Sequence, residues 1–136
     1  GRRFSYGNPE VAAELARLLP EADRVSRPGD RLVVGTGDLR KTPLSEAFLY
    51  YLLPKTRPGT YYIEMDPGVA NATDSRLASD LAHSDIAILS SVWNDFEEPN
   101  DSRKLGSNAA NKVLAREFCL VHNYGGLYRL YRRCAK

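Results

Sequence analysis

The chain has 136 residues and a mass of 15.2 kDa, which is enough for one domain and too short for two. Its composition, 43% hydrophobic and 26% charged residues, is typical of a globular protein in water rather than of a disordered or fibrous one. The formal net charge of +2 argues against a dedicated nucleic-acid binder. No apolar run approaches the ~18–20 residues that are needed to cross a bilayer.

The small net charge conceals an uneven distribution along the chain. Residues 1–42 carry eight Lys or Arg and six Asp or Glu, residues 43–102 carry three and ten, and residues 103–136 carry eight and one. An acidic middle segment is therefore followed by a basic end. The chain starts at Gly1 without an initiator Met or a signal-peptide pattern, so we expect it to be a segment of a larger protein.

The first half of the chain predicts alternating helices and strands. Asn8 suits a helix N-cap, Pro9 suits the first helical position, and apolar residues follow at helical spacing as far as Leu19. Pro20 and the polar stretch after it predict that this helix does not continue. The elements expected next are a strand at residues 32–35, a helix that starts at Thr42–Pro43 and stops at Pro54, and a strand at residues 61–65.

The second half continues the alternation and predicts the fold. The expected elements are a short helix that starts at residue 74 or 75, a strand at 86–89, a polar excursion at 90–107, a helix at 108–117, and two strands at 118–122 and 127–132 around a Gly125-Gly126 turn. This order builds a parallel sheet with right-handed crossovers. We expect one α/β domain over residues 1–136, small, three-layered and Rossmann-like, with a mostly parallel sheet of about five strands. The C-terminal hairpin would add an antiparallel strand at its edge.

Polar side chains gather in the loops that should follow the strands, where ligands of open α/β sheets bind. The residues expected to line such a site are Asp38, Arg40, Glu64, Asp66, Trp93, Glu98, Asn100 and Arg103. Carboxylates would accept hydrogen bonds from a hydroxyl-rich ligand or hold a divalent cation, Arg would meet a phosphate or carboxylate, and Trp would stack on a sugar face. The alternative is structural: the carboxylates cap helices, satisfy turns and pair with nearby cations, and Trp93 anchors its loop.

Common catalytic and cofactor motifs are missing from the sequence. Gly35-Thr36-Gly37 begins like a dinucleotide fingerprint, but Arg40 occupies the third glycine position. The sequence contains no phosphate-binding P-loop and no Gly-x-Ser-x-Gly elbow. His83 and His122 have no zinc-binding spacing. We therefore expect no cofactor and no metal site, and we assign no catalytic residue.

Cys119 and Cys134 flank the expected hairpin on strands that run antiparallel. A two-residue turn at Gly126-Leu127 would place the two cysteines directly opposite each other. A four-residue loop would instead pair Cys119 with Arg132 and leave Cys134 two residues away on the same face. Either register permits a cross-strand disulfide, which an oxidising compartment would favour. The alternative is two unpaired cysteines, one buried and one near the C-terminus.

Four segments give the chain a resemblance to a known class of proteins. They are residues 34–43 (VGTGDLRKTP), 62–68 (YIEMDPG), 98–103 (EPNDSR) and 127–134 (LYRLYRRC). Together they resemble the C-terminal domain, outside the bilayer, of multi-span actinobacterial membrane proteins. Those proteins are described as glycosyltransferases of the polytopic type that depends on lipid-phosphate sugars. The resemblance covers essentially the whole chain.

The resemblance implies a domain that follows the last membrane helix of a cell-membrane protein and lies on the extracytoplasmic side. Catalytic acidic residues of such enzymes lie near N-terminal membrane helices, so none carries over to this chain. We therefore expect a non-catalytic accessory or ligand-binding domain. Its expected partners are the membrane-embedded part of the same polypeptide and a glycan or lipid-linked sugar, without nucleic acid. The alternative is a free-standing small α/β enzyme that acts on a sugar or phosphorylated substrate through the strand-end carboxylates.

Overall fold

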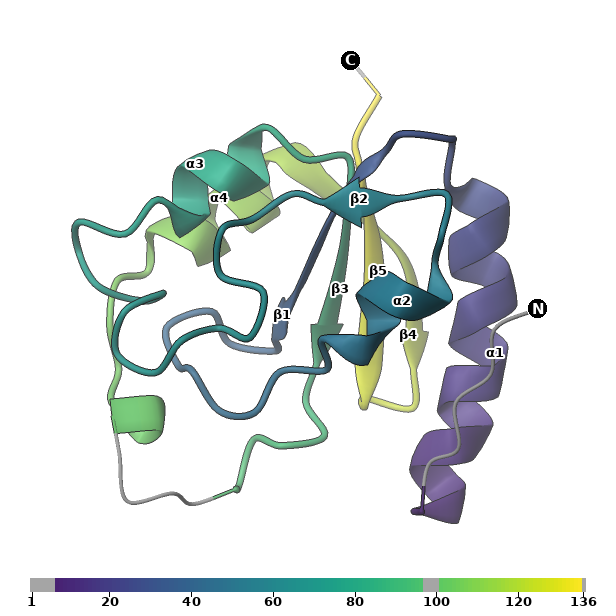
Figure 1. Cartoon of the computed structure of the whole chain (residues 1–136), viewed down its shortest axis with the longest axis horizontal. Coiled ribbons are helices and arrows are strands. Elements are labelled where there is room, and N and C mark those ends of the chain that lie inside the picture. Colours follow the sequence, from purple (N-terminus) through teal and green to yellow (C-terminus); the bar gives the residue numbers. More distant parts are fainter. Residues whose placement is uncertain (1–6, 97–100, 136) are drawn as a thin grey trace.

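The computed structural model describes residues 7–96 and 101–135 and shows an α/β domain around one five-stranded sheet (Figure 1). The elements in chain order are α1 (Pro9–Val25), β1 (Arg31–Thr36), α2 (Phe48–Leu52), β2 (Arg57–Pro58), α3 (Leu77–Ala82), β3 (Ile86–Ser90), the 3₁₀ turn η1 (Asp101–Arg103), α4 (Ala109–Glu117), β4 (Phe118–Tyr124) and β5 (Tyr128–Arg133). The strand order is β2-β1-β3-β5-β4. β1 is parallel to β2 and β3, whereas β5 is antiparallel to β3 and β4. The sheet is therefore mixed, with a parallel first part and antiparallel C-terminal strands.

The C-terminal hairpin is confirmed, but its place in the sheet differs from the prediction. The last strand, β5, lies between β3 and β4, so that β4 and not β5 forms the edge. The side chains explain this order. Tyr128 and Leu130 of β5 are completely buried, whereas most residues of β4 between its ends are exposed. A strand with alternating buried apolar residues is stabilised more at the centre of the sheet than at its edge.

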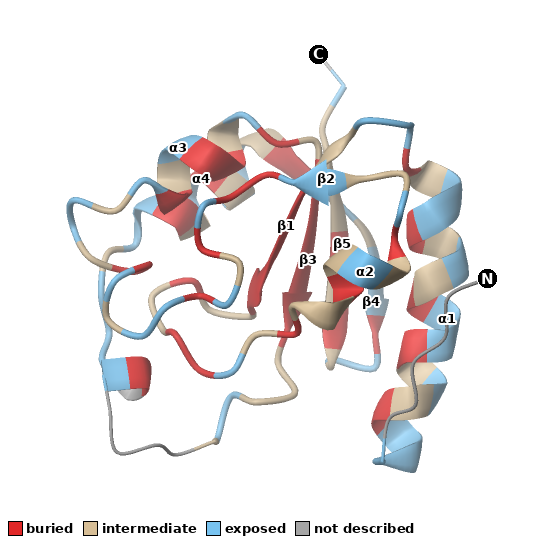
Figure 2. Cartoon of the chain, in the orientation of Figure 1, coloured by how far each residue is buried: buried red, intermediate tan, exposed pale blue. Residues whose placement is uncertain are grey.

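Two apolar clusters cover the two faces of the sheet. Along β1, Leu32 and Val34 belong to one cluster and Val33 belongs to the other, as expected because successive strand residues point to opposite faces. Helices α1 and α2 contribute to the first cluster, and α3 and α4 contribute to the second. β1 and β3 are buried along almost their whole length, as the red strands in Figure 2 show. The continuous apolar run at residues 86–89 predicted this burial correctly.

The first helix is longer than its sequence predicts. α1 continues through Pro20 to Val25, so the predicted stop at Pro20 is wrong. Proline inside a helix removes one backbone hydrogen bond and crowds the preceding turn. The apolar face of the helix nevertheless continues beyond it, because Ala22 is fully buried against the same cluster as Leu15 and Leu18. Packing of that last turn against the sheet offsets the cost of the proline.

The second strand does not lie at residues 61–65. β2 comprises only Arg57–Pro58, and the predicted strand is an irregular loop instead. Its backbone bonds explain the difference, because the Tyr61 N–H donates to the Asp80 carboxylate and the Met65 N–H donates back to the Tyr62 carbonyl. Met65 also has a positive φ of 51°, a left-handed conformation that a strand cannot contain. Tyr62 and Met65 are buried in the second apolar cluster, but as residues of this loop and not of the sheet.

The helix expected after Thr42 is mostly absent. Only Phe48–Leu52 is helical, and residues 41–46 are irregular. Thr42 is buried, and its backbone N–H donates to the Ser102 carbonyl. Its hydroxyl accepts a bond from the Gly68 N–H. Because these groups are used by neighbouring loops, the apparent cap residue joins loops together instead of starting a helix.

Candidate functional site

Three long loops meet beyond the carboxyl ends of β1 and β3. They are residues 37–47 after β1, residues 59–76 after β2 and residues 91–108 after β3. Backbone bonds join them: the Gly106 N–H donates to the Arg40 carbonyl at 2.7 Å, and the Ser107 N–H donates to the Asn71 carbonyl at 2.7 Å. The loops that follow β1, β2 and β3 are thus bonded to one another at this end of the sheet. These contacts form the frame of the candidate site.

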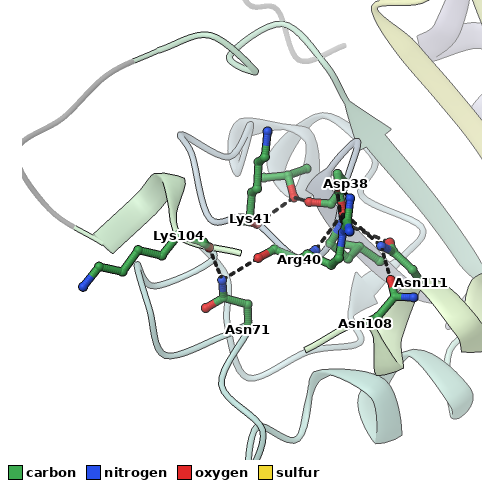
Figure 3. A network of polar contacts seen from close by, with 9 residues as sticks. Asp38, Arg40, Lys41, Asn71, Lys104, Asn108 and Asn111 are labelled. Atoms are coloured by element: carbon green, nitrogen blue, oxygen red, sulfur yellow. Dashed lines mark hydrogen bonds and ion pairs between the residues drawn. The ribbon is translucent and has the colours of Figure 1, made fainter. Parts of the chain in front are cut away.

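Asn71 lies at the centre of this frame (Figure 3). Its side chain is buried, and its amide nitrogen donates to the Arg40 carbonyl at 2.6 Å and to the Lys104 carbonyl at 3.0 Å. One side chain from the second loop thus binds both of the other two loops. The same residue begins an Asn-Ala-Thr sequence of the N-glycosylation type, but its amide is buried and hydrogen-bonded. A glycan at Asn71 is incompatible with this structure.

Asp38 is held by a second set of bonds in the first loop. Nε and Nη2 of Arg40 both donate to its carboxylate, with 2.8 Å between Nη2 and Oδ2. Asn111 of α4 donates to Asp38 Oδ1 at 2.9 Å, while its own Oδ1 accepts a bond from the Leu39 N–H (Figure 3). The side-chain bonds from Arg40, above all, and those from the Arg40 backbone and Asn111 hold the pKa of Asp38 well below its usual range. Asp38 is therefore charged at any physiological pH.

Asp38 and Arg40 line one surface hollow of about 630 Å³. Its other walls are α4, from Asn108 to Ala115, and the side chains of Phe118, Leu120 and Tyr131 on the β4–β5 hairpin. One end of the hollow is thus polar and charged, and the other is apolar. The Arg40 side chain is 43% exposed, so its guanidinium can meet an anionic or hydroxyl group without leaving Asp38.

Glu64 and Asp66 lie in a different hollow. It has a volume of about 210 Å³ and is also lined by Thr42, Pro43, Leu44, Ser45 and Pro67. Both carboxylates are on exposed residues, and the buried Ser45 Oγ has no hydrogen-bond partner among the described residues. The two carboxylates can accept hydrogen bonds from a polyhydroxylated molecule, and the Ser45 hydroxyl beside them is a hydrogen-bond donor. The structure thus distributes these four site residues over two hollows, two in each.

The other four predicted site residues are Trp93, Glu98, Asn100 and Arg103. Trp93 is partly buried in the turn after β3 and contacts Phe96 edge-on, with 5.5 Å between the ring centres. This contact is that of a loop anchor, and Trp93 lines neither hollow. Arg103 lies in η1. Glu98 and Asn100 lie outside the described residues.

Thr42, Asn71 and Asn111 are the residues of this region that sequence reasoning missed. Each acts through contacts with residues far away in the chain, such as the bond between Leu39 and Asn111, which are 72 positions apart. Neither composition nor spacing marks an asparagine that will bind a distant loop. The polar character of residues 90–107 was the available signal, and it indicated a loop without showing what the loop contacts.

The hairpin carries a disulfide between Cys119 and Cys134, with 5.1 Å between their Cα atoms. The ladder pairs Cys119 with Arg132, so the disulfide is diagonal, as in the second of the two registers considered from the sequence. A β-bulge at Val121 shifts the register by one residue along the hairpin. The connection between β4 and β5 is the three residues 125–127.

Within residues 7–96 and 101–135, no three His, Cys, Asp or Glu side chains are grouped so that they could hold a metal ion. In the same part of the chain, no helix has both the length and the apolar character of a membrane span. His122 contacts Arg17 of α1 and the ring of Tyr124, and His83 bonds to the Ser79 carbonyl. Both histidines thus have local structural contacts.

Comparison of the chain with protein-family models, with curated proteins and with solved structures finds no match in any of the three.

Proposed function

We propose that this chain is a non-catalytic, extracytoplasmic accessory domain of a polytopic glycosyltransferase-like membrane protein, and that its strand-end loops bind a glycan or position the membrane-embedded part. The observation that carries the location is the disulfide between Cys119 and Cys134. Disulfides persist in oxidising compartments and are rare in the cytosol, so a paired hairpin favours a domain outside the cytoplasm. The sequence resemblance supports the same side of the membrane and supplies the class of parent protein.

The state of Asp38 supports a binding role over acid–base chemistry. A general acid or base works best with a pKa near the working pH. The bonds from Arg40 and Asn111 hold the pKa of Asp38 well below its usual range, so this carboxylate does not exchange a proton near neutral pH. It can orient Arg40 toward a ligand instead. This geometry favours the accessory domain over the alternative of a free-standing enzyme that uses the strand-end carboxylates.

The proposed binding surface is the end of the sheet where the three loops meet. The hollow with Arg40 suits an anionic or hydroxyl group, and the hollow with Glu64 and Asp66 suits a sugar whose hydroxyls donate to carboxylates. We also propose that the domain is Rossmann-like and has three layers. This description is supported by helices that pack on both sheet faces and by ligand-type loops at the strand ends.

Selective thiol labelling tests the location. Intact cells that express the full-length parent protein are treated with a membrane-impermeant phosphine and then with a membrane-impermeant maleimide. We expect Cys119 and Cys134 to be labelled only after the reductant, as found by mass spectrometry of the peptides. Labelling that requires lysis of the cells would place the domain on the cytoplasmic side and overturn the proposal.

Titration of the 136-residue chain tests binding. Backbone amide shifts are followed by NMR as methyl glycosides of pentoses and hexoses, and separately inorganic phosphate, are added. We expect shifts to be concentrated in residues 37–47 and 62–68, and expect Glu64→Gln with Asp66→Asn to weaken sugar binding at least threefold. Asp74→Asn, another exposed carboxylate in the second loop, is the matched control and should leave binding unchanged. Shifts in none of these residues would remove the ligand-binding part of the proposal.

A further inference from the structure

The two edges of the sheet are built very differently. At one edge, β2 has only two residues, Arg57 and Pro58. Arg57 is charged and Pro58 has no backbone N–H, and both features discourage pairing with another strand. At the other edge β4 has seven residues, FCLVHNY, with no Asp, Glu, Lys, Arg or Pro. An uncharged edge strand of this length is a template for pairing with a further strand.

The hydrogen-bond pattern shows which groups of β4 face outward. The Cys134 N–H donates to the Glu117 carbonyl at 3.0 Å, and the ladder pairs Phe118 with Arg133 and Cys119 with Arg132. In an antiparallel pair, residues alternate between bonding to the partner strand and pointing the other way. Glu117 and Cys119 therefore bond toward β5, and Leu120 directs its N–H and C=O groups out of the sheet. The Phe118 N–H, at the end of α4, donates to the Leu114 carbonyl instead. Within the described residues, no backbone bond outside the sheet ladders involves Leu120.

The side chain of Leu120 adds an apolar contact beside the outward-facing N–H and C=O groups of the same residue. It is 52% exposed, and it lies beside Tyr131, its cross-strand partner, at the apolar end of the hollow formed with α4. The neighbouring disulfide of Cys119 fixes this half of the hairpin, so little conformational entropy is lost when a partner pairs with it.

We propose that β4 is a self-association surface and that its occupant is β4 of a second copy of this chain, antiparallel across a two-fold axis at Leu120. On that axis, the Leu120 N–H of each copy donates to the Leu120 carbonyl of the other, and the two leucine side chains meet on one face. Self-pairing brings no like-charged Asp, Glu, Lys or Arg side chains together, because residues 118–124 contain none of these residue types. The bulge at Val121 bends the strand and limits the ladder to the residues next to Leu120, so the dimer is weak and concentration-dependent. This inference does not rest on the proposed function.

Sedimentation equilibrium of the 136-residue chain, with its disulfide intact, tests the proposal. Between micromolar and millimolar concentration we expect the average mass to rise from 15.2 kDa toward twice that value. Leu120→Lys places two cations on the axis and should keep the chain monomeric over the same range. Leu105→Lys is the matched control, since Leu105 is 60% exposed in a loop far from β4 in the sequence, and it should associate like the wild type.

Amide hydrogen exchange gives a readout that does not depend on a variant's folding. In the wild type, the Leu120 amide should exchange at least tenfold more slowly at millimolar than at micromolar concentration. The Asn94 amide, which bonds only within its own turn, should be unaffected. A wild type that stays monomeric at millimolar concentration, or a dimer in which the Leu120 amide gains no protection, would overturn the proposal. Equal loss of association in Leu105→Lys and Leu120→Lys would do so as well.

Discussion

Replacing Asn71 with aspartate tests whether this one side chain holds the strand-end loops together. Asn71→Asp keeps the shape of the side chain but replaces its donor nitrogen with an oxygen. That oxygen would face the Arg40 and Lys104 carbonyls, which the nitrogen now binds at 2.6 and 3.0 Å. Loss of two hydrogen bonds costs about 2 kcal/mol, and a buried carboxylate against two carbonyl oxygens adds about 1–2 kcal/mol. We expect the free energy of unfolding to fall by about 3–4 kcal/mol at pH 7.

The size of this loss should depend on pH. Repulsion by the two carbonyls raises the folded-state pKa of the new carboxyl above its unfolded value of about 3.9. A group whose pKa is raised in the folded state destabilises the protein above that pKa and costs less as pH falls. The difference between Asn71→Asp and the wild type should therefore shrink from pH 7 toward pH 4. A protonated carboxyl can still donate one of the two lost bonds.

Urea unfolding followed by far-ultraviolet circular dichroism measures both effects. With a slope of about 2 kcal/mol per molar urea, the midpoint should move down by about 1.5–2 M at pH 7. Asn108→Asp is the matched control, because the Asn108 Oδ1 accepts a bond from Asn111 at 2.8 Å and a carboxylate can do the same at the start of α4. Its midpoint should change by less than about 0.3 M. Equal shifts in the two variants, or a loss at Asn71 that does not vary with pH, would refute the reasoning.

Three further changes test contacts elsewhere in the domain. Cys119→Ser removes a disulfide between residues 15 positions apart, so we expect the free energy of unfolding to fall by about 3 kcal/mol. The melting temperature should fall accordingly, and reduction of the wild type should lower it by the same amount. Arg133→Met removes a guanidinium that donates to the Leu81 and Ala82 carbonyls at the end of α3. The free energy of unfolding, measured with urea, should fall by about 2–3 kcal/mol. Arg129→Met on the same strand is the control and should lower it by less than about 0.5 kcal/mol. Asp38→Asn should make the free energy of unfolding fall less steeply as the pH is lowered, as measured by urea unfolding at successive pH values. The pKa of Asp38 is lowered in the folded state, so its contribution is present above its unfolded pKa and is lost as pH falls below about 4.

Each of these expectations has an outcome that would contradict it. A melting temperature that reductant does not change would mean that the disulfide constrains neither state of the chain. Equal losses for the two arginine variants would show that the bonds of Arg133 to the end of α3 contribute nothing beyond its charge. An acid limb unchanged in Asp38→Asn would show that the pair with Arg40 is not coupled to folding.

Local patterns in the sequence predicted much of the fold. The apolar run of β3, the N-cap of α1 at Asn8 and the glycine turn of the hairpin each depend on residues that are neighbours in the chain, and all three are present. The α/β class and the number of strands followed from the same patterns. Errors occurred where a distant contact outweighed a local preference. Burial of Ala22 continues α1 past Pro20, and Asp80 binds the backbone of Tyr61 where a strand was expected.

The candidate site shows the same division. From order alone, the loops after β1 and β3 had to emerge at one end of the sheet, because these strands are parallel. Which side chains meet there depends on the paths of those loops. Asp38 and Glu64 were expected in one site, but the structure places them in separate hollows. Asp38 lies against Asn111 of α4, whereas Glu64 lies beside Thr42 and Pro67.

The sequence by itself determined the length, the class of fold, the strand positions of the buried core and the antiparallel strands that carry Cys119 and Cys134. These properties depend on periodicity and spacing, which neighbouring residues define. Only the tertiary structure decided that β5 is inserted beside β3, that β4 is left as an uncharged edge, and that Asp38 bonds to Arg40 and Asn111. The physical reason is that the most favourable burial of β5 and the partners of buried polar groups are properties of the whole packed chain.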